Sequence, residues 1–313
     1  MTPVIRTESL TKVYISRQRE VRALDRLDLE VQQGEIFGYL GPNGAGKTTT
    51  LRLLLDLIRP TEGRATVLGM AAQADSVKLH HQIGFLPGEL NLWRNLTGEQ
   101  VAAYIGRIRG GVDNAYTRQL AERLELDMSL RVKAYSTGNK RKLGLVLALM
   151  NRPPLLLLDE PTSGLDPLMQ QVFNQMMREV RDEGRTVFLS SHVLSEVQAI
   201  CDRVGILRGG ELKAVERVDS LTQAKFRWVT LRFNEAVSPR LVEGLPGVSE
   251  ISAFNNTLRF QLNGDFDPLL RAISGQYVVD IRIEEPSLEE IFLAFYGGDA
   301  PAANASVQKA QVN

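Results

Sequence analysis

A glycine-rich segment at residues 41–49 constrains this chain more than any other feature. It reads Gly-Pro-Asn-Gly-Ala-Gly-Lys-Thr-Thr and fits the pattern of a glycine, four free positions and then Gly-Lys-Thr. The apolar residues Ile36–Leu40 before it are typical of a buried strand, and Leu51, Leu54 and Leu55 after it share one helical face. The sequence therefore predicts a strand, a phosphate-binding loop and a helix in succession, as at the start of an α/β fold.

The residue types in this loop suit an anionic ligand. Glycines let the loop curl so that successive backbone N–H groups point at one anion, and the helix N-terminus adds partial positive charge. Lys47 is expected to reach the β- and γ-phosphates of a nucleotide, and the Thr48 hydroxyl to ligate Mg²⁺. The candidate nucleotide contacts are Gly41, Pro42, Asn43, Gly44, Ala45, Gly46, Lys47, Thr48 and Thr49.

Two adjacent carboxylates follow a second apolar strand. Four leucines at residues 155–158 lie between prolines and precede Asp159 and Glu160, as in a central parallel strand. Acidic residues at the carboxyl end of such a strand lie where open α/β sheets bind ligands. We assign Asp159 to the Mg²⁺ shell and Glu160 to polarising the attacking water. His192, after another apolar strand, can donate to a γ-phosphate from the same edge, although a lone histidine at a strand end is more often structural.

The length and pattern of the chain indicate two domains. With 313 residues it exceeds one small domain, and the pattern of elements changes after about residue 220. We expect a nucleotide-binding domain at residues 1–219, with a helical subdomain inserted at about residues 95–153. A small α+β domain is expected at residues 220–297, because its predicted order, β-α-β-β-α-β, is the ferredoxin-like plan. Within it, Ser287 and Glu290 are expected to cap a last helix. Residues 298–313, rich in Ala, Gln and Asn, are expected to form a disordered tail.

The composition indicates which partners and which cellular compartment suit the protein. The 37 basic and 37 acidic residues cancel, so no net field draws the chain to nucleic acid, and none is expected as a partner. A single cysteine, Cys201, suits a reducing compartment. The sequence has no apolar run of the ~20 residues that span a bilayer and no signal-peptide pattern, so we expect a cytoplasmic protein. Any action at a membrane then requires another chain to supply the spans.

The order of these motifs resembles that of ATP-binding cassette (ABC) ATPases. Residues 41–49, 135–139, 155–160 and 163–166, followed by His192, correspond to that family's Walker A loop, signature, Walker B strand, D-loop and switch histidine. The resemblance covers about residues 4–215. Near the C-terminus, Pro-Ser-Leu-Glu-Glu-Ile-Phe-Leu at residues 286–293 resembles the ending of nucleotide-binding subunits of bacterial drug and antibiotic exporters, of the daunorubicin- and bacitracin-export type.

The resemblance implies roles that residue types alone do not. Tyr14 resembles the aromatic residue on which adenine stacks. Ser136 and Gly138 resemble signature residues that contact the γ-phosphate held by the opposite subunit, and Asp166 resembles a residue that communicates across that interface. A single cassette then implies a dimer with a second nucleotide-binding subunit, and a separately encoded integral membrane permease as partner.

The sequence departs from the family pattern at two places. The usual glutamine after the strand at residues 83–86, which touches Mg²⁺ and faces the membrane partner, falls on Gly88. Glu89 follows it and is our candidate metal ligand there. The signature reads Ser-Thr-Gly-Asn where Ser-Gly-Gly-Gln is commoner, but it keeps the glycine that contacts phosphate. Leu92 and Trp93 suit either a docking surface for a permease helix or simple packing.

The sequence thus predicts an α/β P-loop ABC cassette with a helical insert and a small C-terminal α+β domain. Its expected function is to hydrolyse ATP with Mg²⁺ as the motor subunit of an exporter, peripheral on the inner face of the cell membrane through the permease. One alternative is a soluble ABC ATPase of translation or DNA maintenance, which normally has two cassettes or a long coiled coil. The other is a regulatory module that binds ATP without turnover, against which Glu160 argues.

Overall fold

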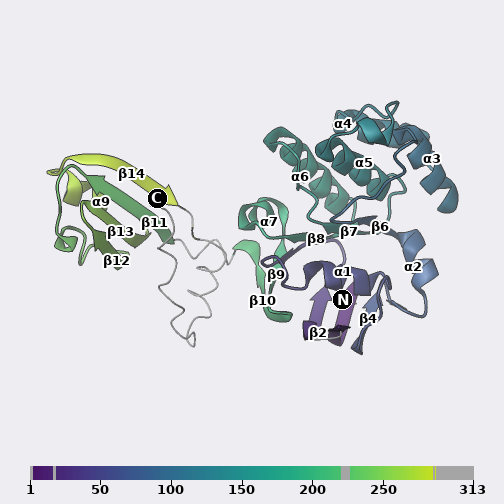
Figure 1. Cartoon of the computed structure of the whole chain (residues 1–313), viewed down its shortest axis with the longest axis horizontal. Helices are drawn as coiled ribbons and strands as arrows, with labels where there is room; N and C mark the ends of the chain where they lie inside the picture. Colours follow the sequence, from purple (N-terminus) through teal and green to yellow (C-terminus); the bar gives the residue numbers. More distant parts are fainter. Residues whose placement is uncertain (1–2, 17–18, 220–225, 285, 287–313) are drawn as a thin grey trace. The chain divides into compact units, whose positions relative to one another are not determined.

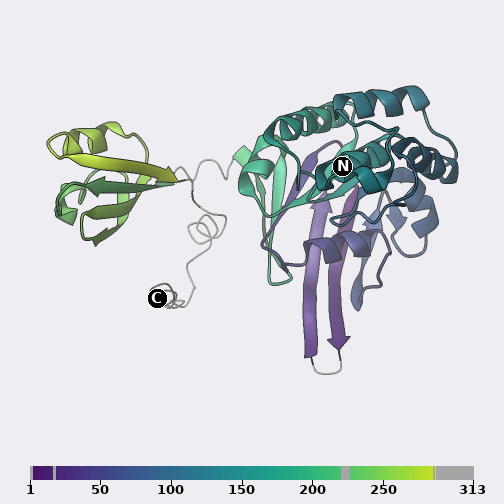
Figure 2. The ribbon, with the colours of Figure 1, turned by 45° about the horizontal axis from the view of Figure 1, so that its top comes forward.

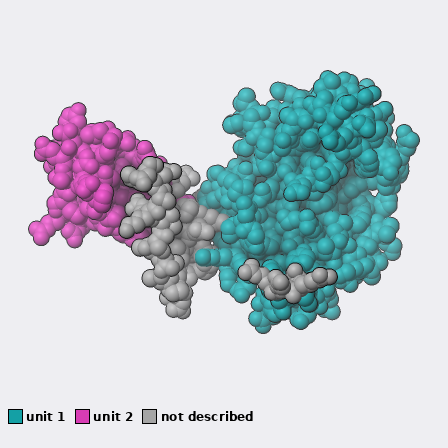
Figure 3. All heavy atoms as spheres, in the orientation of Figure 1, with its two compact units in different colours: residues 1–220 teal, residues 221–313 magenta. Residues whose placement is uncertain are grey.

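The structure, a computed structural model, describes residues 3–16, 19–219, 226–284 and 286. The chain divides into two compact units, residues 1–220 and 221–313, which are coloured separately in Figure 3. The predicted helix from Ser287 and the predicted tail at residues 298–313 lie outside the described residues.

A six-stranded sheet forms the centre of the first unit. Its strand order is β10-β9-β3-β8-β7-β6, and each neighbouring pair is parallel except the β9–β10 hairpin. The strands are β3 (Ile36–Leu40), β6 (Ile83–Leu86), β7 (Leu155–Asp159), β8 (Thr186–Ser191), β9 (Arg203–Arg208) and β10 (Glu211–Arg217). Because β3, β8 and β7 are parallel neighbours, their carboxyl ends meet at one edge of the sheet.

Apolar side chains on both faces explain why these strands lie at the centre. Every residue of β3, β7 and β8 is buried. Phe37 and Tyr39 pack with helix α1 (Lys47–Leu54), whereas Gly38 faces Val197 of α7 (Leu194–Ile200) on the other side. Figure 1 shows α1 below the sheet, and α5 (Thr137–Leu149), α6 (Pro167–Asp182) and α7 above it. Burial on both faces favours a continuous apolar strand over an alternating one.

A second sheet of this unit, with the order β2-β1-β4-β5, packs against α1 and the central sheet. Figure 2 shows β1 (Ile5–Ser16) and β2 (Arg19–Val31) as two long purple strands. The sequence analysis did not predict β4 (Glu62–Val67), β5 (Met70–Ala71) or helix α2 (Ser76–Gln82). Of these three elements, only Val67 and Leu79 are buried, so neither a strand nor a helix period stands out in the sequence.

The helical segment predicted at about residues 95–153 contains α3 (Gly98–Ile108), α4 (Asn114–Arg123), a 3₁₀ turn at Val132–Ala134 and α5. Thr97 and Gln100 form a capping box at the start of α3, in which each side chain accepts a hydrogen bond from the backbone of the other. Ser136 caps α5. Among the helices of the described residues, none combines the length and the apolar character needed to cross a bilayer.

The second unit is a small α+β fold built on one antiparallel sheet. Its elements are β11 (Phe226–Phe233), a 3₁₀ turn η2 (Pro239–Leu241), β12 (Val248–Phe254), β13 (Thr257–Asn263), α9 (Asp267–Ile273) and β14 (Val278–Glu284). The sheet order is β12-β13-β11-β14. This succession follows the β-α-β-β-α-β plan, with η2 in place of the first helix. Asn255, in the turn between β12 and β13, has a φ of 53°, the left-handed backbone that asparagine tolerates.

Candidate active site

The loop between β3 and α1 depends on glycine for its shape. Gly46 has a φ of 111°, and a Cβ atom added there would lie 2.5 Å from the Ala23 carbonyl oxygen. A Cβ atom on Gly41 would lie 2.4 Å from the Leu207 carbonyl oxygen. The loop therefore passes too close to neighbouring backbone to carry side chains at these two positions. It ends at Lys47, where the first N–H groups of α1 have no acceptor within the helix and are available to an anion.

Lys47 lies inside this loop with only 5% of its surface exposed. Its Nζ atom donates to the carbonyl oxygens of Gly41 at 2.6 Å and Pro42 at 3.2 Å, and lies 3.7 Å from Glu160 Oε1. Burial lowers the pKa of Lys47, while the charges of Glu160 and Asp159 act in the opposite direction. The loop thus holds a buried ammonium group beside the carboxyl end of β7.

Two hydroxyl groups converge on the carboxylate of Asp159. Thr48 Oγ1, in the first turn of α1, donates to Asp159 Oδ2 at 2.8 Å, and Ser190 Oγ, near the end of β8, donates to Oδ1 at 2.6 Å. Asp159 and Ser190 are neighbours in the β7–β8 register. The oxygens of Thr48 and Asp159 are hard donors of the kind that Mg²⁺ prefers, so this pair fits the ion. No group of three or more His, Cys, Asp or Glu residues suited to a metal occurs in the part of the chain that the structure describes.

Glu160 turns toward the same edge through an unusual backbone conformation. Its φ is +48°, a left-handed value that is costly for a residue other than glycine. Its N–H group donates to both the carbonyl and the hydroxyl oxygen of Ser190, which holds the turn. Glu160 Oε1 lies 3.1 Å from His192 Nδ1, a hydrogen bond that needs the proton on Nδ1. The structure therefore brings Lys47, Thr48, Asp159, Glu160 and His192 together at one sheet edge.

Sequence reasoning missed Ser190 and Glu196, which hold this edge together. Glu196, in the first turn of α7, accepts hydrogen bonds of 2.6 Å from the hydroxyls of both Thr162 and Ser191. Thr162 follows Glu160 by two residues, and Ser191 directly precedes His192. The carboxylate of Glu196 thus ties together the two segments that carry Glu160 and His192. The position of Glu196 four residues after His192 was a signal for this contact, but only the fold shows the partners.

The signature segment and the predicted D-loop meet each other. The Ser136 hydroxyl accepts from the N–H of Asn139, and a Cβ atom on Gly138 would lie 2.8 Å from the Gly164 carbonyl oxygen. Asp166 caps α6 by accepting from the N–H of Met169 at 3.0 Å. Each of these contacts is structural, and none of them tests a role toward a second subunit.

Two further candidates, Tyr14 and Glu89, lie on the exposed surface. Tyr14, on β1, is 40% exposed, and the Lys12 ammonium lies 5.2 Å from its ring centroid. Glu89 is also exposed. It is the backbone of Gly88 that lies against the carboxylate of Asp159, because a Cβ atom there would be 3.1 Å from Asp159 Oδ2. A role for Glu89 as a metal ligand stays a prediction.

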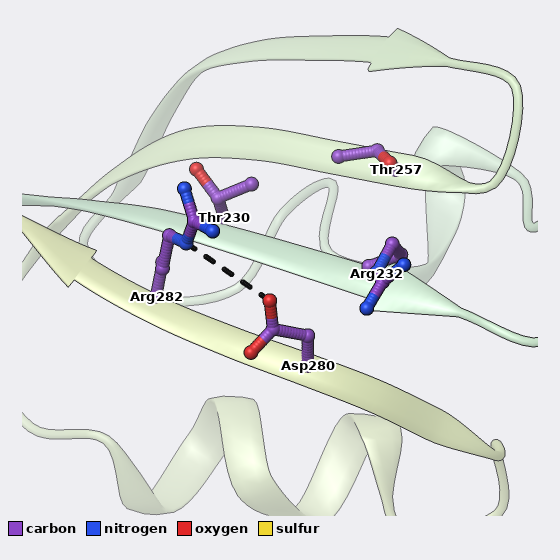
Figure 4. Close-up of a pocket in the computed structure, with 5 residues that line it drawn as sticks. All are labelled: Thr230, Arg232, Thr257, Asp280 and Arg282. Atoms are coloured by element: carbon purple, nitrogen blue, oxygen red, sulfur yellow. Dashed lines mark ion pairs between the residues drawn. The ribbon is translucent and has the colours of Figure 1, made fainter.

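Hollows in the described part of the chain also lie outside this edge. One, of about 510 Å³, is lined by residues 90–94, Val132 and Lys140 of the first unit. Another, of about 350 Å³, lies in the second unit on the face of the sheet away from α9 and is shown in Figure 4. It is lined by Thr230, Arg232, Thr257, Asp280 and Arg282, and Asp280 pairs with Arg282 at 4.0 Å.

The family model and the similar proteins found by sequence comparison agree on one family. The sequence pattern described as "ABC transporter" matches residues 24–163. The bacitracin transport ATP-binding protein BcrA of Enterococcus faecalis is 30% identical over 310 residues, which cover 95% of this chain and 98% of that protein. The human phospholipid-transporting ATPase ABCA7 is 34% identical over 93% of this chain, a region equal to 14% of that much longer protein.

Solved structures agree with the sequence comparison. The dimeric post-hydrolysis structure of the ATP-binding cassette MJ0796, bound to ADP and inorganic phosphate, superposes with a TM-score of 0.63 at 26% identity. The match covers 68% of this chain and 98% of that one. It fits a cassette of about the size of the first unit.

Proposed function

This chain belongs to the ABC transporter family as a subunit that binds and hydrolyses ATP, and from that premise we propose that it drives an exporter through a separate membrane permease. The observation that carries the proposal is the convergence of Lys47, Asp159, Glu160 and His192 on one sheet edge beside the glycine loop. A cassette that only bound nucleotide would not need a carboxylate in contact with both Lys47 and His192 at this place.

Each residue has a distinct task in the proposed reaction. The loop N–H groups and Lys47 bind the β- and γ-phosphates, and Tyr14 stacks on the adenine. Thr48 and Asp159 would hold Mg²⁺, and the bound ion would supply positive charge beside the phosphate oxygens. Glu160 accepts a proton from the attacking water. In the imidazolium form, which has a proton on each ring nitrogen, His192 donates to the γ-phosphate from Nε2 and to Glu160 from Nδ1, and the second bond keeps both groups in place.

The active unit in this proposal contains two cassettes. Ser136 and the backbone of Gly138, at the N-terminus of α5, form hydrogen bonds to the γ-phosphate bound by the partner subunit, and Asp166 lies at the same interface. Such charge-assisted bonds stabilise the closed dimer only while ATP is bound, so hydrolysis lets it open. The dimeric form of the MJ0796 cassette supports this arrangement.

The hollow at residues 90–94 is our proposed docking place for the permease. Trp93 is 48% exposed and Tyr104, on α3, is 46% exposed, and their rings contact edge to face at 5.0 Å. Exposed aromatic side chains around a concave surface are typical anchors for a partner helix. Docking there would hold the protein at the cytoplasmic face of the membrane. The cargo is a drug, an antibiotic or another hydrophobic compound, as the relative named for bacitracin transport suggests.

A test of this mechanism combines two variants. Glu160→Gln protein binds ATP without turning it over, so light scattering should show a dimer with ATP and a monomer with ADP. Adding Ser136→Arg places a bulky cation at the expected interface and should abolish the ATP-dependent dimer. Affinity purification of the tagged full-length protein from its native membranes should also retain a polytopic membrane protein.

Two results would contradict the proposal. An unchanged oligomer with ATP, with ADP and in the double variant would show that ATP does not control association. Wild-type protein without steady-state ATPase activity would remove the motor function itself.

A further inference from the structure

A buried arginine ties the loop after β6 to the helix that carries the signature. Arg141 lies on α5, five residues after Ser136, and is only 7% exposed. Its Nη1 donates to the Pro87 carbonyl oxygen and its Nη2 to the Gly88 carbonyl oxygen, both at 2.8 Å. Nη1 also lies 3.5 Å from the carbonyl oxygen of Asp159. A buried guanidinium needs such partners, because an unpaired charge in the interior is costly.

The Pro87–Gly88 loop that Arg141 holds lies directly against Asp159, a candidate metal ligand. Gly88 faces the carboxylate of Asp159 but has no side chain with which to contact it. Helix α5 also packs closely on both sides of the loop, since a Cβ atom on Gly144 would lie 2.5 Å from a methyl of Leu86 and 2.9 Å from one of Leu90. The apolar contacts set the distance between helix and loop, and the guanidinium sets the orientation of the two carbonyl groups.

Charge reinforces this placement. Burial lowers the pKa of Arg141, and the negative charges of Asp159 and Glu160 act in the opposite direction. The charges of the two carboxylates thus partly offset the cost of burying the guanidinium.

We propose that Arg141 is a positioning residue for ATP hydrolysis, which holds the Pro87–Gly88 backbone and the carboxyl end of β7 in register. This inference rests on the proposed function, because the reaction that Arg141 supports is ATP hydrolysis. The loop that Arg141 holds also continues into residues 90–94, which line the docking hollow. The Arg141 guanidinium thus connects helix α5, which Ser136 caps, to the docking loop and to the end of β7 at Asp159. The planar guanidinium presents two N–H donors from separate nitrogen atoms at a fixed spacing to successive carbonyls, whereas a lysine ammonium would have to reach both from one nitrogen atom.

The test compares Arg141→Met and Arg141→Lys in the full-length protein. A displacement of about 1 Å in a catalytic group can cost up to ~100-fold in rate. We expect Arg141→Met to lower kcat by roughly 10- to 100-fold while the Kd for ATP changes by no more than about threefold, because the hydrogen bonds of Arg141 described above go to Pro87, Gly88 and Asp159 rather than to the glycine loop. Arg141→Lys should recover only part of kcat.

Arg109 provides a matched control. It is also a partly buried arginine that donates to a backbone carbonyl of β6, with Nη2 2.7 Å from the oxygen of Ile83, at the opposite end of the strand. Arg109→Met should lower the melting temperature, as Arg141→Met does, but leave kcat within about twofold, the effect expected of a structural contact alone.

Three outcomes would overturn the inference. They are wild-type kcat in Arg141→Met, an equal loss of kcat in Arg109→Met, and a lower ATPase rate in Arg141→Met that disappears at saturating ATP. If Arg141→Met does not fold, Arg141→Lys decides, because wild-type kcat in that variant would show that the planar guanidinium is not needed. Since wild-type ATPase activity is measured in the same assay, its presence or absence judges the proposed function separately from Arg141.

Discussion

The six-stranded sheet of the first unit and the sheet of the second unit hold similar polar residues but arrange them differently. In the first unit, β3, β7 and β8 are parallel, so the residues that end them gather at one edge. In the second unit, neighbouring strands are antiparallel and their ends alternate between two edges. Polar side chains there spread over one face of the sheet, as Figure 4 shows for Thr230, Asp280 and Arg282. Strand direction thus decides whether the same residue types converge on one point or line a surface.

Convergence changes what a carboxylate can do. Glu160 lies within 3.1 Å of His192 and 3.7 Å of Lys47, with its backbone fixed by Ser190. Asp280 pairs with Arg282 at 4.0 Å, and their side chains are 44% and 72% exposed. An exposed pair of this kind contributes about 0–1 kcal/mol to stability. The comparison predicts that equivalent substitutions have large effects at the edge and small ones on the face.

The largest expected contrast is between Glu160→Gln and Asp280→Asn. Removing a general base typically costs 10²- to 10⁴-fold, so kcat of Glu160→Gln should fall by roughly that factor while ATP still binds. Asp280→Asn makes the same chemical change in the second unit and should leave kcat unaltered. Steady-state phosphate release by the two purified variants provides the measurement, and near-normal turnover in Glu160→Gln would refute its role as the base.

A smaller contrast concerns two cations, in Lys47→Ala and Arg282→Ala. A hydrogen bond to a charged group is worth about 1.5–3 kcal/mol, so the Kd for ATP should rise by roughly 10- to 100-fold in Lys47→Ala. Arg282→Ala should not change it. Titration with a fluorescent ATP analogue measures both constants, and an unchanged affinity in Lys47→Ala would contradict its assignment to the phosphates.

The sequence predicted the elements that have a strong local signal. The strand, loop and helix around residues 36–54 follow from the glycine motif. The helix caps at Thr97, Ser136 and Asp166 also depend on residues within three or four positions of each other. The β-α-β-β-α-β order predicted for the C-terminal domain includes a first helix, but the structure has only a 3₁₀ turn there, at Pro239–Leu241.

What the sequence did not reveal depends on contacts between distant segments. Strand β4 has a weak pattern of its own and is fixed by its pairing with β1, as in the register of Val67 with Ile5. The hydrogen bond from Thr48 to Asp159 spans 111 positions, and that from Arg141 to Gly88 spans 53. Residue types identified the candidates Asp159 and Glu160, but the roles of Ser190, Glu196 and Arg141 required the fold.

The smallest expected effect comes from removing the second unit altogether. All the hydrogen bonds and ion pairs described at the candidate site join residues of the first unit, from Gly41 to Glu196. The second unit has its own apolar core, which includes Val229, Leu231 and Phe260, so neither unit needs the other to bury its interior. We therefore expect that a chain ending at Asp219 folds and binds ATP with a Kd within about twofold of the full-length value, as for a change remote from the site.

This truncation separates the candidate site of the first unit from the polar sheet face of the second unit more completely than any point substitution. Circular dichroism and a single cooperative melting transition would establish that residues 1–219 are folded, and Lys47→Ala in the same shortened chain provides the control for specific nucleotide binding. A folded chain that no longer bound ATP would mean that the second unit supplies a nucleotide contact. The inference from strand direction, that only the sheet of the first unit serves nucleotide binding, would then be wrong. Unchanged affinity would instead place the task of the polar face outside nucleotide binding, because its residues would be dispensable for every contact to the phosphates.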